Sequence, residues 1–396
     1  MSQRLATWKL LCAGISSLIL VMGIARFAMT PLLPAMQAAT GLGDDGAGFL
    51  AASNYAGYLS GALFASRLRD PLKKLFYFRL GIVFAVLTTA AMALSDHVII
   101  WSVLRYFGGL TSAAGMVIGT AIILDHLKQR HRPDFIGIHF SGVGLGVVLS
   151  GTVLTLIEPI MSWDQGWLLV GGIGLLLALP CLFWMNVHNL NTAPAAHADA
   201  VSMRSKPILF LLISYGFAGA TFSIGTTFII SIMAQSPSLS DSRNLAWILL
   251  GVALAPSCYF WMRSAVKLGD FRALTLAYLL QALGCALPVI WPSTASALIG
   301  GFLFGACFMG IVTVVLALGG KLSPHNPSAL IGILVVSYGV GQIVGPVLAG
   351  IAMEKTGYSE IGLWSAAACS LLSIVTLAGS RCPGDKPVEE NCGCLT

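Results

Sequence analysis

Long apolar runs follow one another along nearly the whole chain, and short polar stretches separate them. A helix needs roughly 20 mostly apolar residues to cross a bilayer, and the sequence offers twelve such runs. They lie at residues 9–36, 47–66, 75–94, 98–125, 134–157, 166–185, 207–234, 244–262, 271–291, 294–320, 328–353 and 359–379. The pattern predicts an all-α membrane protein with twelve transmembrane helices.

A polar segment divides the predicted spans into two sets of six. The segment from Asn186 to Lys206 is rich in Ala, Asn and Ser and has no apolar periodicity, which is typical of a linker. We therefore expect an N-terminal half at residues 1–186, a cytoplasmic linker at 187–206, a C-terminal half at 207–380 and a cytoplasmic tail at 381–396.

The two halves resemble each other in sequence. Residues 136–146 in the fifth span align with residues 331–341 in the eleventh, and five of the eleven positions are identical. Gly23 and Thr30 of the first span similarly match Gly219 and Thr226 of the seventh. Two pseudo-symmetric six-helix bundles are typical of secondary transporters, whose substrate site lies near the bilayer midplane between the repeats.

Composition and charge agree with this interpretation. Hydrophobic residues make up 57% of the chain and charged residues 10%, against roughly 25% charged in a soluble domain. The net charge of +6 does not indicate nucleic-acid binding, because the Lys and Arg residues lie in short loops. With the N-terminus inside, cytoplasmic loops and tails carry 18 of the 22 Lys and Arg residues. The positive-inside rule then predicts that both termini are cytoplasmic.

Two arginines, Arg26 and Arg105, lie deep within predicted spans. A charge at the bilayer centre costs roughly 2.5 to 3.5 kcal/mol on insertion scales, so each is expected to face a cavity or a partner. No Asp or Glu lies in the middle of a predicted span. An anionic ligand, bound by the planar guanidinium in bidentate fashion, would compensate the charge.

A structural interpretation of the two arginines stands beside this one. Pro31 and Pro34 lack an N–H, so they leave the carbonyls of Phe27 and Thr30 without helical donors. Arg26 can satisfy these carbonyls as a brace, contact a substrate, or take part in gating. Arg105 lies about two turns from the outer end of its span, where it can instead extend to the membrane interface.

Several motifs resemble the major facilitator superfamily over essentially the whole chain. They are Arg105 followed by "YFGGLTSAAG", "SGVGLGVVLSG" in the fifth span and "GQIVGPVLAG" in the eleventh. The stretches "GIARFAMTPLLPAMQ" and "ASNYAGYLSGAL" are similar to the YbfB/YjiJ branch of bacterial inner-membrane transporters. The resemblance implies a multi-pass protein of the bacterial inner membrane in which spans one, four, seven and ten surround a central cavity.

Candidate substrate-binding residues share helix faces on these spans and their neighbours. Phe222 and Phe302 are the repeat counterparts of Arg26 and Arg105, so we expect a cavity that is electropositive on one side and aromatic on the other. The alternative for each aromatic residue is interhelical packing. The full set is Arg26, Thr30, Asn54, Tyr58, Arg105, Tyr215, Phe222, Thr226, Phe302, Tyr338 and Gln342.

Coupling and gating have separate candidates. His139 in the fifth span can carry a proton near neutral pH, or it can simply bond a neighbouring helix. The superfamily usually has an aspartate in the loop after the second span, where this chain has Ala65. Arg67, Arg69 and Asp70 follow it as candidates for a cytoplasmic gate.

The leading hypothesis is secondary transport of a small organic solute by alternating access, with an anionic or amphipathic anionic substrate and export preferred. The alternatives are a proton-coupled drug or sugar exporter and a transporter-like membrane sensor. We do not expect an enzyme, because the sequence has no zinc motif, nucleophile elbow or phosphate loop. We expect a monomer in the lipid bilayer that takes a small-molecule substrate, with no nucleic acid, metal or cofactor; coupling to protons is left open.

Overall fold

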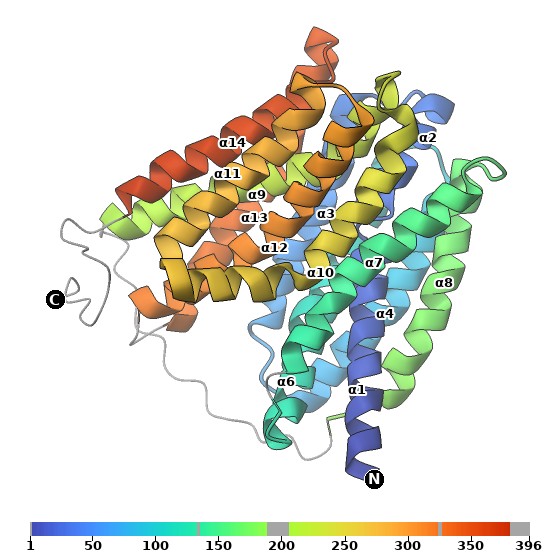
Figure 1. The fold of residues 1–396 in the computed structure, drawn as a ribbon. Coiled ribbons are helices and arrows are strands. Elements are labelled where there is room, and N and C mark those ends of the chain that lie inside the picture. Colours follow the sequence, from blue (N-terminus) through green and yellow to red (C-terminus); the bar gives the residue numbers. More distant parts are fainter. Residues whose placement is uncertain (1, 133–134, 188–205, 324–326, 381–396) are drawn as a thin grey trace.

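The computed structural model describes residues 2–132, 135–187, 206–323 and 327–380, and these residues form helices joined by short loops (Figure 1). The N-terminal group of helices comprises α1 (Ser2–Leu18), η1 (Ile19–Ile24), α2 (Met29–Thr40), α3 (Asp44–Ala65), α4 (Pro71–Ala91), η2 (Met92–Leu94), α5 (Val98–Ala113), η3 (Ala114–Gly119), α6 (Thr120–Gln129), α7 (Ile136–Ile157) and α8 (Trp163–Trp184). The C-terminal group comprises α9 (Lys206–Gln235), η5 (Ser240–Ser242), α10 (Arg243–Leu268), α11 (Asp270–Ile290), α12 (Thr294–Leu322), α13 (Pro327–Thr356) and α14 (Ile361–Gly379). The predicted tail and nearly all of the predicted linker lie outside the described residues.

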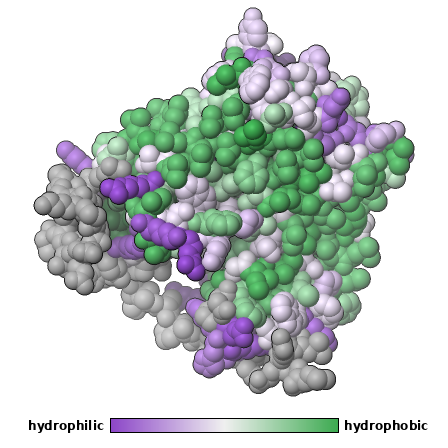
Figure 2. All heavy atoms as spheres, viewed as in Figure 1, coloured by the Kyte–Doolittle hydropathy of each residue, from purple (hydrophilic) through white to green (hydrophobic). Residues whose placement is uncertain are grey.

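Eleven helical segments of the described chain are long and apolar enough to cross a membrane. On the face drawn in Figure 2, a broad apolar belt lies between two more polar ends. The second predicted span corresponds to α3, which has 22 residues but is not among the eleven. Its Gly, Ser, Asn and Tyr residues lower its mean hydropathy, and it packs between α5 and α13. Because neighbouring helices cover it, α3 can carry polar side chains that lipid would not accept.

The first and fourth predicted spans are not continuous α-helices. The first is interrupted by the π-helix η1 and a turn at residues 25–28, and the fourth by the π-helix η3. A π-helical insertion changes the hydrogen-bond register, and such insertions are frequent at functional sites. Both arginines lie close to these interruptions, since Arg26 is in the turn after η1 and Arg105 is two turns before η3.

Glycines bring helices into very close contact within the N-terminal group. A Cβ atom at Gly109 of α5 would lie 1.8 Å from the carbonyl oxygen of Asn54 on α3, and one at Gly57 would lie 1.9 Å from that of Tyr106. We therefore expect Gly109→Ala to separate α3 from α5 and to lower the free energy of unfolding by about 3 kcal/mol. Thermal unfolding of the purified protein measures this effect.

Gly172 of α8 provides the control for this prediction. A Cβ atom there meets nothing within 4 Å, so Gly172→Ala should change stability by no more than about 1 kcal/mol. Equal melting temperatures for Gly109→Ala and Gly172→Ala would show that the α3–α5 contact does not limit stability.

The N-terminal and C-terminal groups meet along equivalent helix pairs. Gly144 of α7 lies against Ala255 of α10, and its repeat counterpart Gly339 of α13 lies against Leu59 of α3. Repeat-related residues thus make related contacts, as a pseudo-two-fold arrangement requires. From this level the two groups stay in contact toward one end of the molecule, while Figure 1 shows their other ends diverging.

We call the end where the groups meet the closed end. The last turns of α2 and α9 lie there, joined by a hydrogen bond from Ser231 to the Gln37 side chain. The starts of α1 and α9 are therefore at the opposite end. Gly379, the last residue of α14, lies against Phe210 near the start of α9. The first helix thus begins, and the last helix ends, at the same end of the molecule.

Candidate functional site

Arg26 occupies the centre of the molecule, between the two groups of helices. Its side chain is 4% exposed, yet Nε has no hydrogen-bond partner and the single polar contact of the guanidinium is to Met22 Sδ, 4.0 Å from Nη1. Aromatic rings surround it instead. The guanidinium carbon lies 4.6 Å from the ring centroid of Tyr55, 4.7 Å from Tyr58, 5.7 Å from Phe27 and 5.8 Å from Phe222. Cation–π attraction holds the charge but leaves its N–H groups available.

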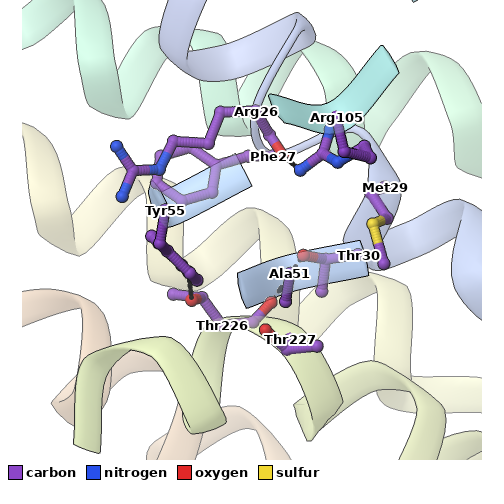
Figure 3. Close-up of a pocket in the computed structure, with 9 residues that line it drawn as sticks. All are labelled: Arg26, Phe27, Met29, Thr30, Ala51, Tyr55, Arg105, Thr226 and Thr227. Carbon is purple, nitrogen blue, oxygen red and sulfur yellow. Dashed lines mark hydrogen bonds between the residues drawn. The ribbon is translucent and has the colours of Figure 1, made fainter. Parts of the chain in front are cut away.

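Arg105 has a different role, although the sequence presents it as the same kind of residue. It is 5% exposed and does not extend to the membrane interface. Its Nη1 donates to the Ala25 carbonyl at 2.7 Å. Its Nη2 donates to the Arg26 carbonyl at 2.9 Å (Figure 3). Arg105 is therefore the brace of the first span, the role that the sequence suggested for Arg26.

Pro31 explains why the brace is needed. Because Pro31 has no N–H, the Phe27 carbonyl loses its helical donor, and the Thr30 N–H bonds that carbonyl instead at 3.1 Å. In a regular α-helix the Thr30 N–H would instead donate to the Arg26 carbonyl. That carbonyl is left without a backbone donor and accepts from Arg105. Buried carbonyls without a donor are costly. The guanidinium of Arg105 supplies the bond to the Arg26 carbonyl and also donates to the Ala25 carbonyl.

Asn54 completes the connection between α3, α5 and the first span. Its Nδ2 donates to the carbonyl of Arg105 at 2.9 Å, and the residue is buried. It makes no hydrogen bond to Arg26. Its position fits a residue that fixes α5 against α3, so that the Arg105 side chain reaches the turn after η1.

Hydroxyl groups join the first, second and seventh predicted spans directly below the arginines. Thr30 donates to the carbonyl of Thr226, and the Tyr55 hydroxyl lies 2.9 Å from the Thr226 hydroxyl. Thr30 and Thr226 are repeat counterparts that contact each other, as residues beside a two-fold axis do. The hydroxyl-bearing side chains of Thr30, Tyr55 and Thr226 therefore separate the centre of the molecule from its closed end.

The C-terminal group contributes aromatic rings. Tyr215 and Tyr338 stack with centroids 4.5 Å apart, and Phe222 stacks on Tyr338 at 6.1 Å. Phe308 lies 4.8 Å from Phe222. The Arg26 cation thus lies against Phe222 of the C-terminal group, the aromatic residue that the repeat alignment gives as its counterpart.

A small cavity of about 20 Å³ lies among these residues in this conformation. It is lined by Arg26, Phe27, Met29, Thr30, Ala51, Tyr55, Arg105, Thr226 and Thr227 (Figure 3). This volume holds about one water molecule. An organic ligand therefore does not fit this cavity in this conformation.

Phe302 lies away from this group, and Gln342 lies at the contact between α9 and α13. Phe302 is 48% exposed on the surface of α12, and Phe308, further along the same helix, takes the place expected for it against Phe222. Gln342 is buried where α13 packs on Gly219 of α9. The repeat alignment pointed to the correct helix but to the wrong face for Phe302.

In the described part of the chain, His139 and the loop after α3 contact residues of the N-terminal group. His139 is fully buried, its Nε2 lies 3.0 Å from the Thr120 hydroxyl, and Gly14 packs against its Nδ1. Asp70 caps α4 by accepting from the Leu72 N–H, and Arg67 donates to the Leu63 carbonyl. Arg69 is exposed beside them. His139 of α7 thus connects to Thr120 of α6. The gate candidates lie at the diverging end.

Sequence reasoning did not select Tyr55, Phe27, Phe308 or Thr227. Tyr55 adjoins the predicted Asn54 and Phe27 adjoins Arg26, but a helix-face argument assigns adjacent positions to different faces. The turn after η1 changes that register for Phe27. Among the described residues, no group of three or more His, Cys, Asp and Glu side chains is arranged to hold a metal.

Comparison with known proteins places the chain in a family. Residues 18–378 match the family model described as "Uncharacterised MFS-type transporter YbfB". The chain belongs to this family. It is a multi-pass membrane transporter of the MFS type, as the motifs in the first, second, fourth, fifth and eleventh spans indicated, and the family and its relatives are transporters and not enzymes.

Relatives of this MFS-type protein include a transporter with a named substrate and an uncharacterized transporter. The 4-hydroxybenzoate transporter PcaK of Pseudomonas putida is 24% identical over 341 residues, which cover 82% of this chain and 69% of PcaK. The uncharacterized MFS-type transporter YcaD of Salmonella paratyphi B is 24% identical over 355 residues, covering 86% of this chain and 88% of YcaD.

Solved structures share the fold at lower identity. The nucleoside transporter NupG superposes with a TM-score of 0.73 at 14% identity, covering 93% of this chain and 98% of NupG. A bacterial homolog of the human lysosomal transporter Spinster, in an inward-facing and unoccupied conformation, gives 0.68 at 15% identity and covers 95% and 96% of the two chains.

Proposed function

We propose that this protein is an alternating-access transporter of small amphipathic organic anions, in particular aromatic carboxylates. One observation carries the proposal: the Arg26 guanidinium is buried at the centre, is surrounded by ring faces, and pairs with no carboxylate in the described part of the chain. A buried charge without a partner is costly. A ligand carboxylate that accepts its free N–H groups would remove this cost.

The rings around Arg26 favour a ligand with a flat apolar body. Tyr58, Tyr338 and Phe222 present faces or edges on which an aromatic ring can pack, at geometries that aromatic pairs prefer. PcaK, a relative over most of the chain, is named for an aromatic carboxylate, 4-hydroxybenzoate. Charge and aromatic surface together therefore support this substrate class over inorganic anions.

The proposal also includes a topology. Twelve spans, with α3 as the second, form two halves at residues 1–186 and 207–380, joined by the cytoplasmic linker 187–206 and followed by the tail 381–396. Loops at the closed end carry Arg243 and Lys355 as their only Lys and Arg residues, so we assign that end to the periplasm of the bacterial inner membrane. The diverging end then faces the cytoplasm, from which an exporter loads. We expect a monomer.

Ligand-induced thermal stabilisation of the purified protein tests this function. Binding stabilises the folded state by about 2.7 kcal/mol when the ligand is at 100 times its dissociation constant. We expect 4-hydroxybenzoate and benzoate to raise the melting temperature. Benzamide, which has the ring without the charge, and acetate, which has the charge without the ring, serve as matched controls and should have little effect. Stabilisation by organic cations but not by carboxylates would refute the proposal.

A further inference from the structure

Two glutamate side chains accept hydrogen bonds across the interface between the two groups of helices at the closed end. Glu158, directly after α7, accepts hydrogen bonds from the side chains of Arg243 and Asn244 at the start of α10. Glu354, in the last turn of α13, accepts from the backbone N–H of Asp44 at the start of α3, at 2.9 Å. In each case a carboxylate at the end of one helix reaches the N-terminus of a helix in the other group.

These two contacts are related by the internal repeat. The alignment of residues 136–146 with 331–341 has an offset of 195 positions, which pairs Glu158 with Met353. Glu354 is the next residue, so the two glutamates occupy nearly equivalent positions in the repeat. The partner helices α3 and α10 are likewise the second span of each repeat. Both contacts border the same hollow of about 550 Å³, which Gln37 and Ser231 also line. Two symmetry-related contacts at one end, across the interface that must separate in alternating access, form a gate.

We infer that Glu158 and Glu354 are paired latches that keep the closed end shut, and that the Glu354 latch responds to pH through Asp44. This inference rests on the alternating access proposed above but not on the identity of the substrate. The Glu354 latch also caps α3 from outside the helix. Gly43 at the N-cap has no side chain to do so, and a carboxylate at a helix N-terminus is stabilised by the free N–H groups and the helix dipole.

The two latches differ in charge. Glu158 faces the cation of Arg243. Glu354 faces the Asp44 carboxyl, which accepts a hydrogen bond from Gln37 at 2.8 Å, and Asp45 lies beside it. The other charged or titratable groups around this end are Lys355 of α13, Asp241 of η5, Tyr358 and Glu360 before α14, Asp164 of α8, and Asp96 and His97 before α5. Ion pairing thus dominates one latch and carboxyl repulsion the other.

Burial, and then the nearby charges of Glu354 and Asp45, raise the pKa of Asp44 above its ordinary value of 3.8, although the Gln37 hydrogen bond opposes the shift. Opening moves Asp44 away from Glu354 and into water, which returns the pKa toward 3.8. The closed gate therefore binds the Asp44 proton more tightly than the open gate does. Acidification favours the closed gate, and this preference is lost as the pH rises through the raised pKa of Asp44.

Double electron–electron resonance measures distances between spin labels, and labels on the N-terminal and C-terminal groups of helices test this inference without any substrate. Ala39 in the last turn of α2 and Ser238 after α9 are exposed, so para-acetylphenylalanine at both positions can carry nitroxide labels while the native cysteines remain. Between about pH 8 and about pH 4.5, we expect the ratio of the short to the long distance population to rise at least threefold. Asp44→Asn should show the short distance at every pH, and Glu354→Ala should shift the population toward the long distance.

Two further variants act as controls. The Asp45 carboxylate bonds the Gly46 N–H within its own helix, so Asp45→Asn should keep the pH response. Glu158→Gln should favour opening but leave the pH response intact. A pH response that persists in Asp44→Asn, or a Glu354→Ala variant as closed as the wild type, would overturn the inference. Neither result bears on aromatic anion binding at Arg26, which the thermal-shift panel measures separately.

Discussion

Replacing Arg26 by glutamine should abolish stabilisation by aromatic carboxylates and lower their transport about 100-fold, without unfolding the protein. Losing a charge-assisted contact to a ligand anion costs about 3 kcal/mol, which corresponds to about a 100-fold change in affinity. The ligand-free protein tolerates the change because the side chain of Arg26 bonds only Met22 Sδ. The substitution loses the cation–π contacts of Arg26, but it also removes the cost of burying a charge without a partner, and the two effects oppose each other. Counterflow of labelled 4-hydroxybenzoate in proteoliposomes measures transport.

Arg26→Lys is the matched variant for this prediction. It keeps the charge but loses the planar fork, so we expect partial retention of binding. If Arg26→Gln unfolds without ligand, Arg26 is structural after all. If Arg26→Gln transports aromatic carboxylates at the wild-type rate, the substrate site lies elsewhere.

Replacing Arg105 by methionine should destabilise the protein by about 3 kcal/mol or more, whether or not ligand is present. The substitution leaves two buried carbonyls, those of Ala25 and Arg26, without donors, at about 1 to 3 kcal/mol each. Methionine has a similar length and keeps much of the packing, so the loss reports on the hydrogen bonds. Thermal unfolding in detergent, together with the yield of monodisperse protein, measures the effect.

Arg79 offers a matched comparison for Arg105. Its Nη2 also donates to a backbone carbonyl, that of Met185 at 3.1 Å, but Arg79 is exposed. Water can replace that bond, so Arg79→Met should cost much less than Arg105→Met. Similar melting temperatures for the two variants would contradict the assignment of Arg105 as the brace. The pair Arg26→Gln and Arg105→Met thus separates ligand binding from folding at two neighbouring cations.

Much of the site could be predicted from the sequence. The repeat register identified Thr30 and Thr226 as equivalent positions, and the structure brings them into contact. It also placed Phe222 opposite Arg26, and the structure has the guanidinium carbon 5.8 Å from that ring. The same register pointed to Phe302 and missed Phe308, because small differences in helix rotation decide which of two nearby rings faces the centre.

The sequence by itself determined where the eleven long apolar helical segments of the described chain lie, because hydropathy is a local sum over about 20 residues and a bilayer requires every backbone group within it to be satisfied in a helix. It also determined that Pro31 must leave a carbonyl without its donor. Only the tertiary structure decided which arginine supplies the missing bonds. That choice depends on how closely α5 approaches α3 and the first span, and Gly109 against Asn54 sets this approach. Contacts between residues about 80 positions apart are not contained in any local pattern, so two arginines alike in sequence became a brace and a free cation.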